Sequence, residues 1–163
     1  MPDTLPRAYA VGRARIADGP AAFEQLVDAT FDPAREVILP APAGGAPEGS
    51  SPFSGTARLV ELRPDRVRIE ADLDQPGYVV LVDAYDPNWT ATIDGRPGEV
   101  RRANLAFRAV EVPAGRHRID YRYRPRSVVI GLGITLAAAL AGAGLALARL
   151  RKPPAPVRAG AAG

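Results

Sequence analysis

The chain has 163 residues, 47% of them hydrophobic and 24% charged, which is the balance of a globular protein with one ordinary core. It contains no cysteine, which excludes disulfides, thiolate metal sites and a cysteine nucleophile, and we expect neither a metal nor a cofactor. Residues 1–127 hold 17 Arg against 18 Asp and Glu, a net charge of −1, so the basicity lies in residues 148–163. A near-neutral head lacks the basic face that nucleic-acid phosphates require, and we expect no nucleic-acid partner.

The first part of the chain predicts two strands around a short helix. We expect a strand over residues 7–16, a helix in residues 18–29 that begins near Pro20, and a strand over residues 36–39. Phe23, Leu26 and Val27 share one face of that helix. Residues 40–55 are rich in Pro, Gly and Ser, which predicts a flexible loop.

After the loop the apolar pattern alternates with a period of two. The segment RVRIEADL, residues 66–73, predicts a strand with one buried and one solvent-exposed face. The segment YVVLVDAY, residues 78–85, predicts a central strand that is apolar on both faces. Further strands are expected at residues 90–93, 99–102, 106–112 and 117–123, with turns at 94–96 and 113–115. The pattern predicts a mainly β, antiparallel sandwich-like domain with one short helix over residues 5–126.

An apolar segment follows the head, VVIGLGITLAAALAGAGLALA, residues 128–148. It has no charged residue and spans about 30 Å as a helix, so we expect one carboxy-terminal transmembrane helix. Its small residues at four-residue spacing, Gly131, Thr135, Ala139 and Ala143, either form a face for another membrane helix or reflect the abundance of Ala and Gly. Residues 149–163 are expected to form a basic, disordered tail.

The order of the short motifs resembles a known family. LPRAYAV, FDPAREVIL and GYVVLVDAYDPNWTATIDGRPGEVRRANLAFRAVEVPAGRHRIDYRYRP, followed by an apolar helix, are similar to the carboxy-terminal portion of YfhO-family bacterial membrane proteins, from about residue 5 to 150. In that family the tryptophan follows a tyrosine pair, a proline and a glycine. Tyr85, Pro87 and Trp89 match this pattern, whereas Asp86 and Asn88 depart from it.

The resemblance implies a multi-spanning protein of the glycosyltransferase C superfamily type, which moves sugars from polyprenyl-phosphate donors onto cell-envelope polymers. The catalytic acidic residues of such proteins lie in early loops that this chain does not contain. The resemblance therefore implies a non-catalytic, extracytoplasmic β-domain and a final helix with a cytoplasmic tail in the cell membrane. If the chain is complete, the charge pattern instead indicates a tail anchor with the head inside.

Trp89 has two interpretations. It is a sugar-stacking platform, helped by Tyr85 and the Asn88 amide, or it seals the core where the chain leaves the central strand, which we favour. Asp83, Asp86 and Asp94 are candidates for a metal or acid–base set, but turn formation explains Asp86 and Asp94. His117 is read as a residue at the start of a strand, and we predict no catalytic residue in this chain.

Arg122 and Arg124 are the other candidate ligand-binding residues. On a strand they share a face with Arg116, Arg118 and Asp120, close in sequence to the apolar helix. They either contact lipid headgroups or the phosphate of a lipid-linked sugar, or lie on an ordinary solvated edge strand.

Two functions follow from these observations. In the first, the chain positions a polyprenyl-phosphate sugar or a glycan beside a polytopic glycosyltransferase subunit. In the second, it is a membrane-anchored β-domain with a purely structural or assembly role, whose helix packs against other membrane helices. The lipid bilayer is the expected partner in both.

Overall fold

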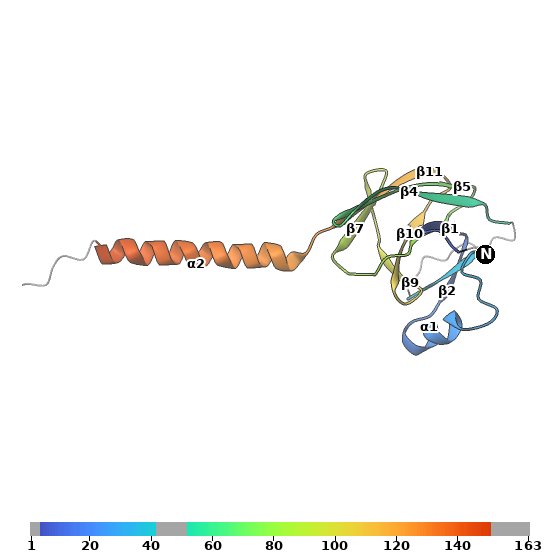
Figure 1. Ribbon diagram of the computed structural model, residues 1–163, viewed down its shortest axis with the longest axis horizontal. Helices are drawn as coiled ribbons and strands as arrows, with labels where there is room; N and C mark the ends of the chain where they lie inside the picture. The colour runs from blue at the N-terminus through green and yellow to red at the C-terminus, as the bar shows by residue number, and fades with distance from the viewer. Residues whose placement is uncertain (1–3, 42–51, 151–163) are drawn as a thin grey trace, which may run out of the picture. The chain divides into compact units, whose positions relative to one another are not determined.

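The computed structural model describes residues 4–41 and 52–150. The chain divides into two compact units, Met1–Arg124 and Pro125–Gly163. Among the described residues, the first unit contains eleven strands and helix α1, and the second contains helix α2 (Figure 1). The predicted tail lies outside the described residues from 151 onward.

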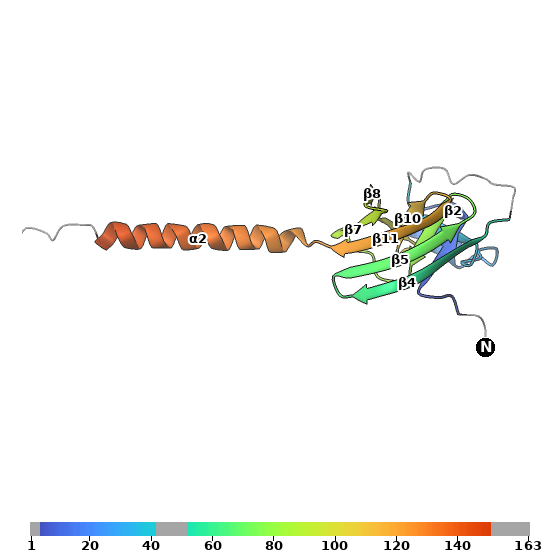
Figure 2. The same cartoon turned by 90° about the horizontal axis from the view of Figure 1, so that it is seen from above.

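Two antiparallel sheets form the head. The four-stranded sheet has the order β1 (Ala8–Val11), β6 (Gly77–Leu81), β10 (Phe107–Val112) and β9 (Arg101–Ala103). The five-stranded sheet has the order β4 (Gly55–Arg63), β5 (Arg66–Leu73), β11 (Gly115–Tyr123), β7 (Trp89–Ile93) and β8 (Arg96–Gly98). Figure 2 shows β4, β5, β11 and β7 of this second sheet side by side. The predicted antiparallel sandwich with one short helix in the head is confirmed.

The main core lies between the sheets. Alternate residues of β5, from Val67 to Leu73, point inward and meet Val79, Leu81 and Val110 of the other sheet. The predicted alternation of β5 is therefore confirmed, since its charged residues are left on the outer face. Burying these side chains contributes roughly 1.5–3 kcal/mol each before chain entropy is counted.

A second core covers the outer face of the four-stranded sheet. There β2 (Arg13–Ile16) pairs in parallel with β3 (Glu36–Leu39), whose Val37 and Leu39 pack against Tyr78 and Val80 of β6. Strand β6 is thus covered on both faces and hydrogen-bonded on both edges. This explains the uninterrupted apolar run from which a central strand was predicted.

The single strand predicted over residues 7–16 is wrong, because the chain divides at Gly12 into β1 and β2, which belong to different sheets. Phe53 packs beside Gly12 and against the core, in a slot whose walls are Gly12, Gly55 and Gly77. Phe53 belongs to residues 40–55, which were predicted to form a flexible loop; residues 42–51 of that segment lie outside the described residues. A Cβ atom at any of the three glycines would lie 2.6–2.8 Å from the Phe53 ring, so only glycine fits there.

Helix α1 (Gly19–Leu26) begins as expected, with Asp18 as its cap and Pro20 in its first turn. The apolar face predicted from Phe23, Leu26 and Val27 is not the packed one. Phe23 is 58% and Val27 66% exposed, whereas Ala22 is the buried residue of the helix. The small Ala22 lets the helix backbone approach the sheet, which a phenylalanine at that position would prevent.

Three strand assignments differ from the sequence prediction. Strand β4 and the short β8 were not predicted, and the strand expected at 99–102 is displaced to β9. Strand β11 is not an edge strand, because β5 and β7 pair with it on either side. The turn at Asp94 and Gly95 is confirmed, with φ values of 51° and 82°.

Helix α2 (Arg126–Leu150) contains the apolar segment 128–148. Its described large side chains, such as Leu132, Ile134 and Leu136, are exposed. Within the described part of the chain, no helix has both the length and the hydropathy of a membrane span.

Candidate functional site

The structure places Tyr85, Asn88 and Arg124 around one corner that follows β6. The Tyr85 amide donates to the Ala106 carbonyl at 2.7 Å, and the Arg124 amide donates to the Asn88 carbonyl at 2.9 Å. The Asn88 side-chain amide donates to the Asp86 carboxylate at 2.8 Å, and the Asn88 backbone amide donates to the same oxygen at 2.7 Å. Asp86 therefore forms the turn that was predicted for it.

Trp89 and Arg122 lie on opposite faces of the five-stranded sheet. In the β7–β11 register Trp89 is opposite Tyr123, and Thr90 is opposite Arg122. The Trp89 and Tyr123 rings pack on the inner face, with centroids 5.2 Å apart, whereas Arg122 is exposed on the outer face. The candidate residues thus form an inner aromatic group and an outer basic group, and not one site.

A buried arginine that the sequence analysis missed completes the inner group. Arg108, on β10, is 3% exposed, and its guanidinium carbon lies 4.0 Å from the centroid of the Trp89 ring. It also lies 5.6 Å from the centroid of the Tyr121 ring. The expected packing of Trp89 against the core is confirmed, and one face of its ring is covered by Arg108. A sugar-binding role of Trp89 stays a prediction.

Asp83 balances the charge of Arg108. Its carboxylate accepts from Arg108 at 3.0 Å and from the exposed Arg7 at 2.6 Å. Burial lowers the pKa of Arg108, and the nearby Asp83 carboxylate opposes that shift. Burial also raises the pKa of Tyr121, so its phenol stays neutral. Three buried polar atoms of this cluster have no hydrogen-bond partner among the described residues: Arg108 Nε, Arg108 Nη1 and Tyr121 Oη.

A small pocket of about 320 Å³ opens beside this cluster, lined by Arg7, Arg63, Asp83 and Trp89 together with apolar residues of the β4–β5 hairpin. It is at the small end of the size range of ligand sites. Its charged groups are two guanidiniums and one carboxylate that already binds Arg7 and Arg108. The pocket can therefore take a small polar or anionic group.

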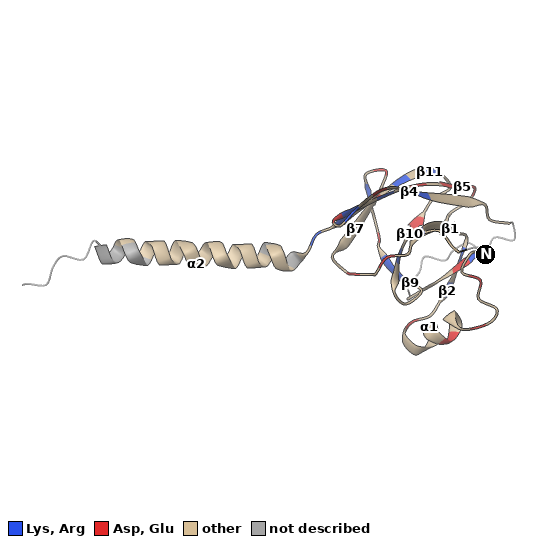
Figure 3. Ribbon diagram, viewed as in Figure 1, with Lys and Arg blue, Asp and Glu red and all other residues tan. Residues whose placement is uncertain are grey.

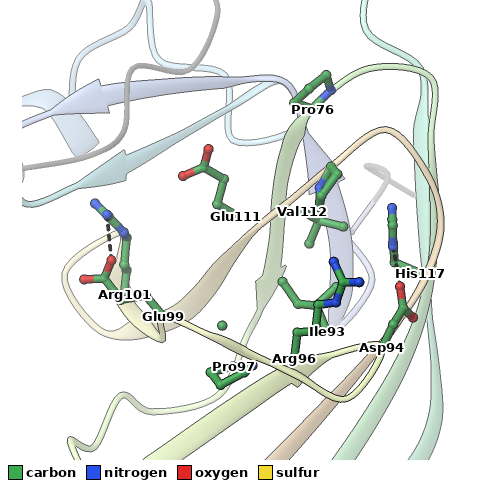
Figure 4. A pocket seen from close by; sticks show the side chains of 12 residues that line it. Pro76, Ile93, Asp94, Arg96, Pro97, Glu99, Arg101, Glu111, Val112 and His117 are labelled. Atoms are coloured by element: carbon green, nitrogen blue, oxygen red, sulfur yellow. Dashed lines mark hydrogen bonds and ion pairs between the residues drawn. The ribbon is translucent and has the colours of Figure 1, made fainter.

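A larger pocket of about 820 Å³ lies near the β7–β8 turn (Figure 4). Ile93, Val112 and Pro97 supply apolar lining. The charged lining comprises Glu99 bound to Arg101, Asp94 bound to His117, and also Arg96 and Glu111. The apolar wall and charges of both signs suit a polar molecule with an apolar side.

The His117 imidazole has no free nitrogen. Its Nδ1 lies 2.6 Å from Asp94 Oδ2, and its Nε2 lies 3.1 Å from the Ala114 carbonyl oxygen. The hydrogen bond to Asp94 raises the pKa of His117, although burial opposes the shift. The Arg118 amide donates to Asp94 Oδ1 at 2.8 Å, and this bond and His117 lower the pKa of Asp94. The pair ties the β7–β8 turn to β11, which agrees with the structural interpretation of both residues.

The aspartates considered as a metal or acid–base set do not converge. Asp83 binds Arg7 and Arg108, Asp86 binds Asn88, and Asp94 binds His117. Within residues 4–41 and 52–150, no three His, Asp or Glu side chains gather as metal ligands.

The described residues thus form a β-domain built on two antiparallel sheets, followed in the chain by the apolar helix α2. Residues 56–135 match the family described as bacterial membrane protein YfhO, and over these residues the chain belongs to that family. The match runs from β4 into α2. No curated protein and no solved structure matches the chain.

Proposed function

We propose that this chain is the carboxy-terminal, non-catalytic part of a YfhO-like protein of cell-envelope glycosylation, and that it positions a lipid-linked sugar or its acceptor. The family match over residues 56–135 carries the proposal. In this proposal α2 spans the membrane once, with the head extracytoplasmic and the tail cytoplasmic. The absence of charge from Ser127 to Ala148, about 30 Å of helix, supports the span.

The proposed ligand-binding residues are Tyr85, Asn88, Trp89, Arg122 and Arg124. Arg122 and Arg124 are exposed, and a guanidinium fork matches the oxygens of a phosphate. Binding of a polyprenyl-phosphate sugar to the detergent-solubilised chain tests this role. We expect Arg122→Ala with Arg124→Ala to weaken binding at least tenfold, and Arg58→Ala with Arg116→Ala, on the same sheet face, to leave it unchanged. Equal binding by both variants would overturn the role of Arg122 and Arg124.

Topology is tested separately, because the chain has no cysteine of its own. Glu24→Cys places a single thiol on exposed α1, and Ala159→Cys places one in the tail. In intact cells a membrane-impermeant reagent is expected to label the first variant and to reach the second only after lysis. The reverse pattern would place the head in the cytoplasm and overturn the glycosylation role.

A purely structural or assembly role is the second candidate. The arrangement at the corner favours it, since Arg108 covers one face of Trp89 and the Asn88 amide is bound to Asp86. Under this role the chain associates with partner membrane helices but binds no lipid-linked sugar, and mutations at residues 85–89 change stability alone.

A further inference from the structure

The outer face of the five-stranded sheet contains one cross-strand row whose three side chains are all positively charged. Cross-strand neighbours on β4, β5 and β11 form four rows on this face. Three rows combine arginine with an acidic residue: Glu61–Arg68–Asp120, Arg58–Glu70–Arg118 and Thr56–Asp72–Arg116. The fourth row is Arg63–Arg66–Arg122, which we call the arginine row. Figure 3 shows basic and acidic segments interspersed over these strands.

Like charges directly opposite each other destabilise a sheet, so the arginine row needs negative charge nearby. Arg63 and Arg66 obtain it from the next row, through Glu61 at 2.7 Å and Asp120 at 2.9 Å. Both acceptors are shared, because Arg68 binds Glu61 and Asp120, and Arg118 also binds Asp120. The carboxylates of Glu61 and Asp120 thus pair with four arginines, and Arg122 is not among them.

The row retains unused donors. Among the described residues, the Arg122 side chain has no hydrogen-bond or ion-pair partner, and Arg66 Nε is buried without an acceptor. Arg63 is 69% exposed despite its contact with Glu61. Asp65, in the β4–β5 turn, contacts β11 through its backbone oxygen, which accepts from the Tyr123 amide at 2.9 Å. The arginine row therefore presents to solvent the unpaired guanidinium of Arg122 and the largely exposed guanidinium of Arg63.

We infer that the arginine row is a docking surface for the phosphates of anionic lipid headgroups, which orients the head on the bilayer. Arginine forks pair with phosphate oxygens, and anionic leaflets attract basic residues that lie next to a membrane helix. Arg122 precedes the first residue of α2 by only four positions, and Arg124 and Arg126 extend the basic segment. This inference rests on the proposed anchoring of α2 in the bilayer.

The test uses the full chain in nanodiscs, with Thr90→Cys as a single labelling site. Thr90 is exposed and lies opposite Arg122 in the register, so an environment-sensitive dye there reports on the arginine row. We expect the dye emission to shift to the blue when phosphatidylglycerol replaces part of the phosphatidylcholine. Added salt should reverse the shift, because it screens exposed charges.

Two variants that each remove two charges from this face provide the comparison. Arg63→Gln with Arg122→Gln should lower the ratio of docked to undocked head on the order of 30-fold, from about fivefold per arginine near an anionic surface. Arg58→Gln with Arg116→Gln, whose arginines bind Glu70 and Asp72, should change it much less. Equal effects of the two variants, or no shift with phosphatidylglycerol, would overturn the inference.

Two further measurements distinguish lipid docking from binding of a soluble phosphate and from loss of the anchor. If inorganic phosphate shifts the dye in neutral nanodiscs at matched ionic strength, the row binds a soluble phosphate and the inference is wrong. Alkaline carbonate extraction of vesicles tests the anchor alone. A chain that resists extraction but shows no lipid-dependent shift disproves only the docking surface, whereas a chain that is extracted disproves the proposed anchor.

Discussion

Arg108 lies over the ring of Trp89, with its guanidinium carbon 4.0 Å from the ring centroid, inside a domain whose other buried residues are almost all apolar. A guanidinium over an indole face contributes about 2 kcal/mol when water is excluded. Burying its charge is tolerated because Asp83 binds it at 3.0 Å. The only tryptophan of the chain is therefore held in place by a charged residue from the opposite sheet.

This arrangement predicts that Asp83→Asn destabilises the domain by about 3 kcal/mol or more, because Arg108 then lies buried without a counter-charge. Asp83→Asn combined with Arg108→Met should recover much of the loss, since neither charge remains. Urea unfolding of the solubilised chain, followed by Trp89 fluorescence, measures both effects. Arg7→Met is the matched control: it removes the half-exposed partner of Asp83 and should cost at most about 1 kcal/mol.

Additive losses in the double variant would contradict this account. In that case Asp83 and Arg108 would stabilise the domain independently of each other.

The sequence predicted those parts of the fold that follow from alternation. Strands β5, β6 and β11 were predicted because buried residues such as Ile69, Val79 and Ile119 recur with a period of two or form a continuous run. The turn at Asp94 and Gly95 was predicted because few residues adopt its positive φ angles.

The missed features depend on partners that are distant in the chain. Gly12 ends a strand because Phe53, 41 residues later, fills the space beside it. In the sequence, Arg108 looks like an ordinary solvent-exposed strand residue. Its two partners, Trp89 on β7 and Asp83 after β6, come next to it only in the folded domain. Among the candidate residues, the outward direction of Arg122 follows from alternation along β11, whereas the contact of Arg108 with the Trp89 ring depends on strands from two different sheets.

The pair of His117 and Asp94 predicts a pH-dependent stability. The pKa of His117 is raised in the folded state, so its contribution is complete below the unfolded value near 6.5 and is lost as the pH rises through the folded value. The pKa of Asp94 is lowered, so its contribution is present above about 4 and is lost as the pH falls through the folded value. The pair should stabilise the domain most between about pH 4 and 6.5.

Melting curves of the parent chain and of His117→Gln measure this effect. The difference in Tm should be largest in that interval and should shrink above it. Glu99→Gln, which removes an exposed carboxylate of the same pocket, serves as the control and should leave the pH profile unchanged. A difference in Tm that is constant from pH 5 to 9 would show that protonation of His117 is not involved.

The slot of Phe53 predicts different couplings for two of its glycines. A Cβ at Gly55 would lie 2.6 Å from Phe53 Cζ and 2.8 Å from Phe53 Cε1, whereas a Cβ at Gly77 would also lie 2.7 Å from the backbone oxygen of Val11. We expect Gly55→Ala and Gly77→Ala each to cost about 1–3 kcal/mol through overpacking. In a Phe53→Ala background, which removes the ring, Gly55→Ala should lose most of its cost, whereas Gly77→Ala should keep most of its cost.

Urea unfolding of the three single and two double variants gives the coupling energies directly. Equal coupling of both glycines to Phe53 would mean that β1 moves away from a Cβ at Gly77. Phe53→Ala alone should cost about 2–4 kcal/mol, because the ring packs against the main core.

Asn104, in the β9–β10 turn of the four-stranded sheet, connects this sheet to β3, which covers its outer face. It is 5% exposed, its Oδ1 accepts from the Ile38 amide at 2.8 Å, and its own amide donates to the Ile38 carbonyl at 2.9 Å. Its φ of 46° is one that asparagine tolerates and most residues do not. Burial raises the pKa of Tyr9, and a hydrogen bond with the Asn104 side chain opposes that shift.

Asn104→Ala should therefore destabilise the domain by about 2–4 kcal/mol, from an unsatisfied buried amide at Ile38 and a strained backbone at residue 104. Asn104→Gly removes the same hydrogen bond but tolerates the positive φ, so it should recover about 1 kcal/mol of that loss. Urea unfolding measures both values, and hydrogen exchange of the Ile38 amide should be faster in both variants than in the parent chain. Unchanged exchange at Ile38 would mean that β3 is held by its pairing with β2 and not by Asn104, and the link between the layers would have to be sought elsewhere.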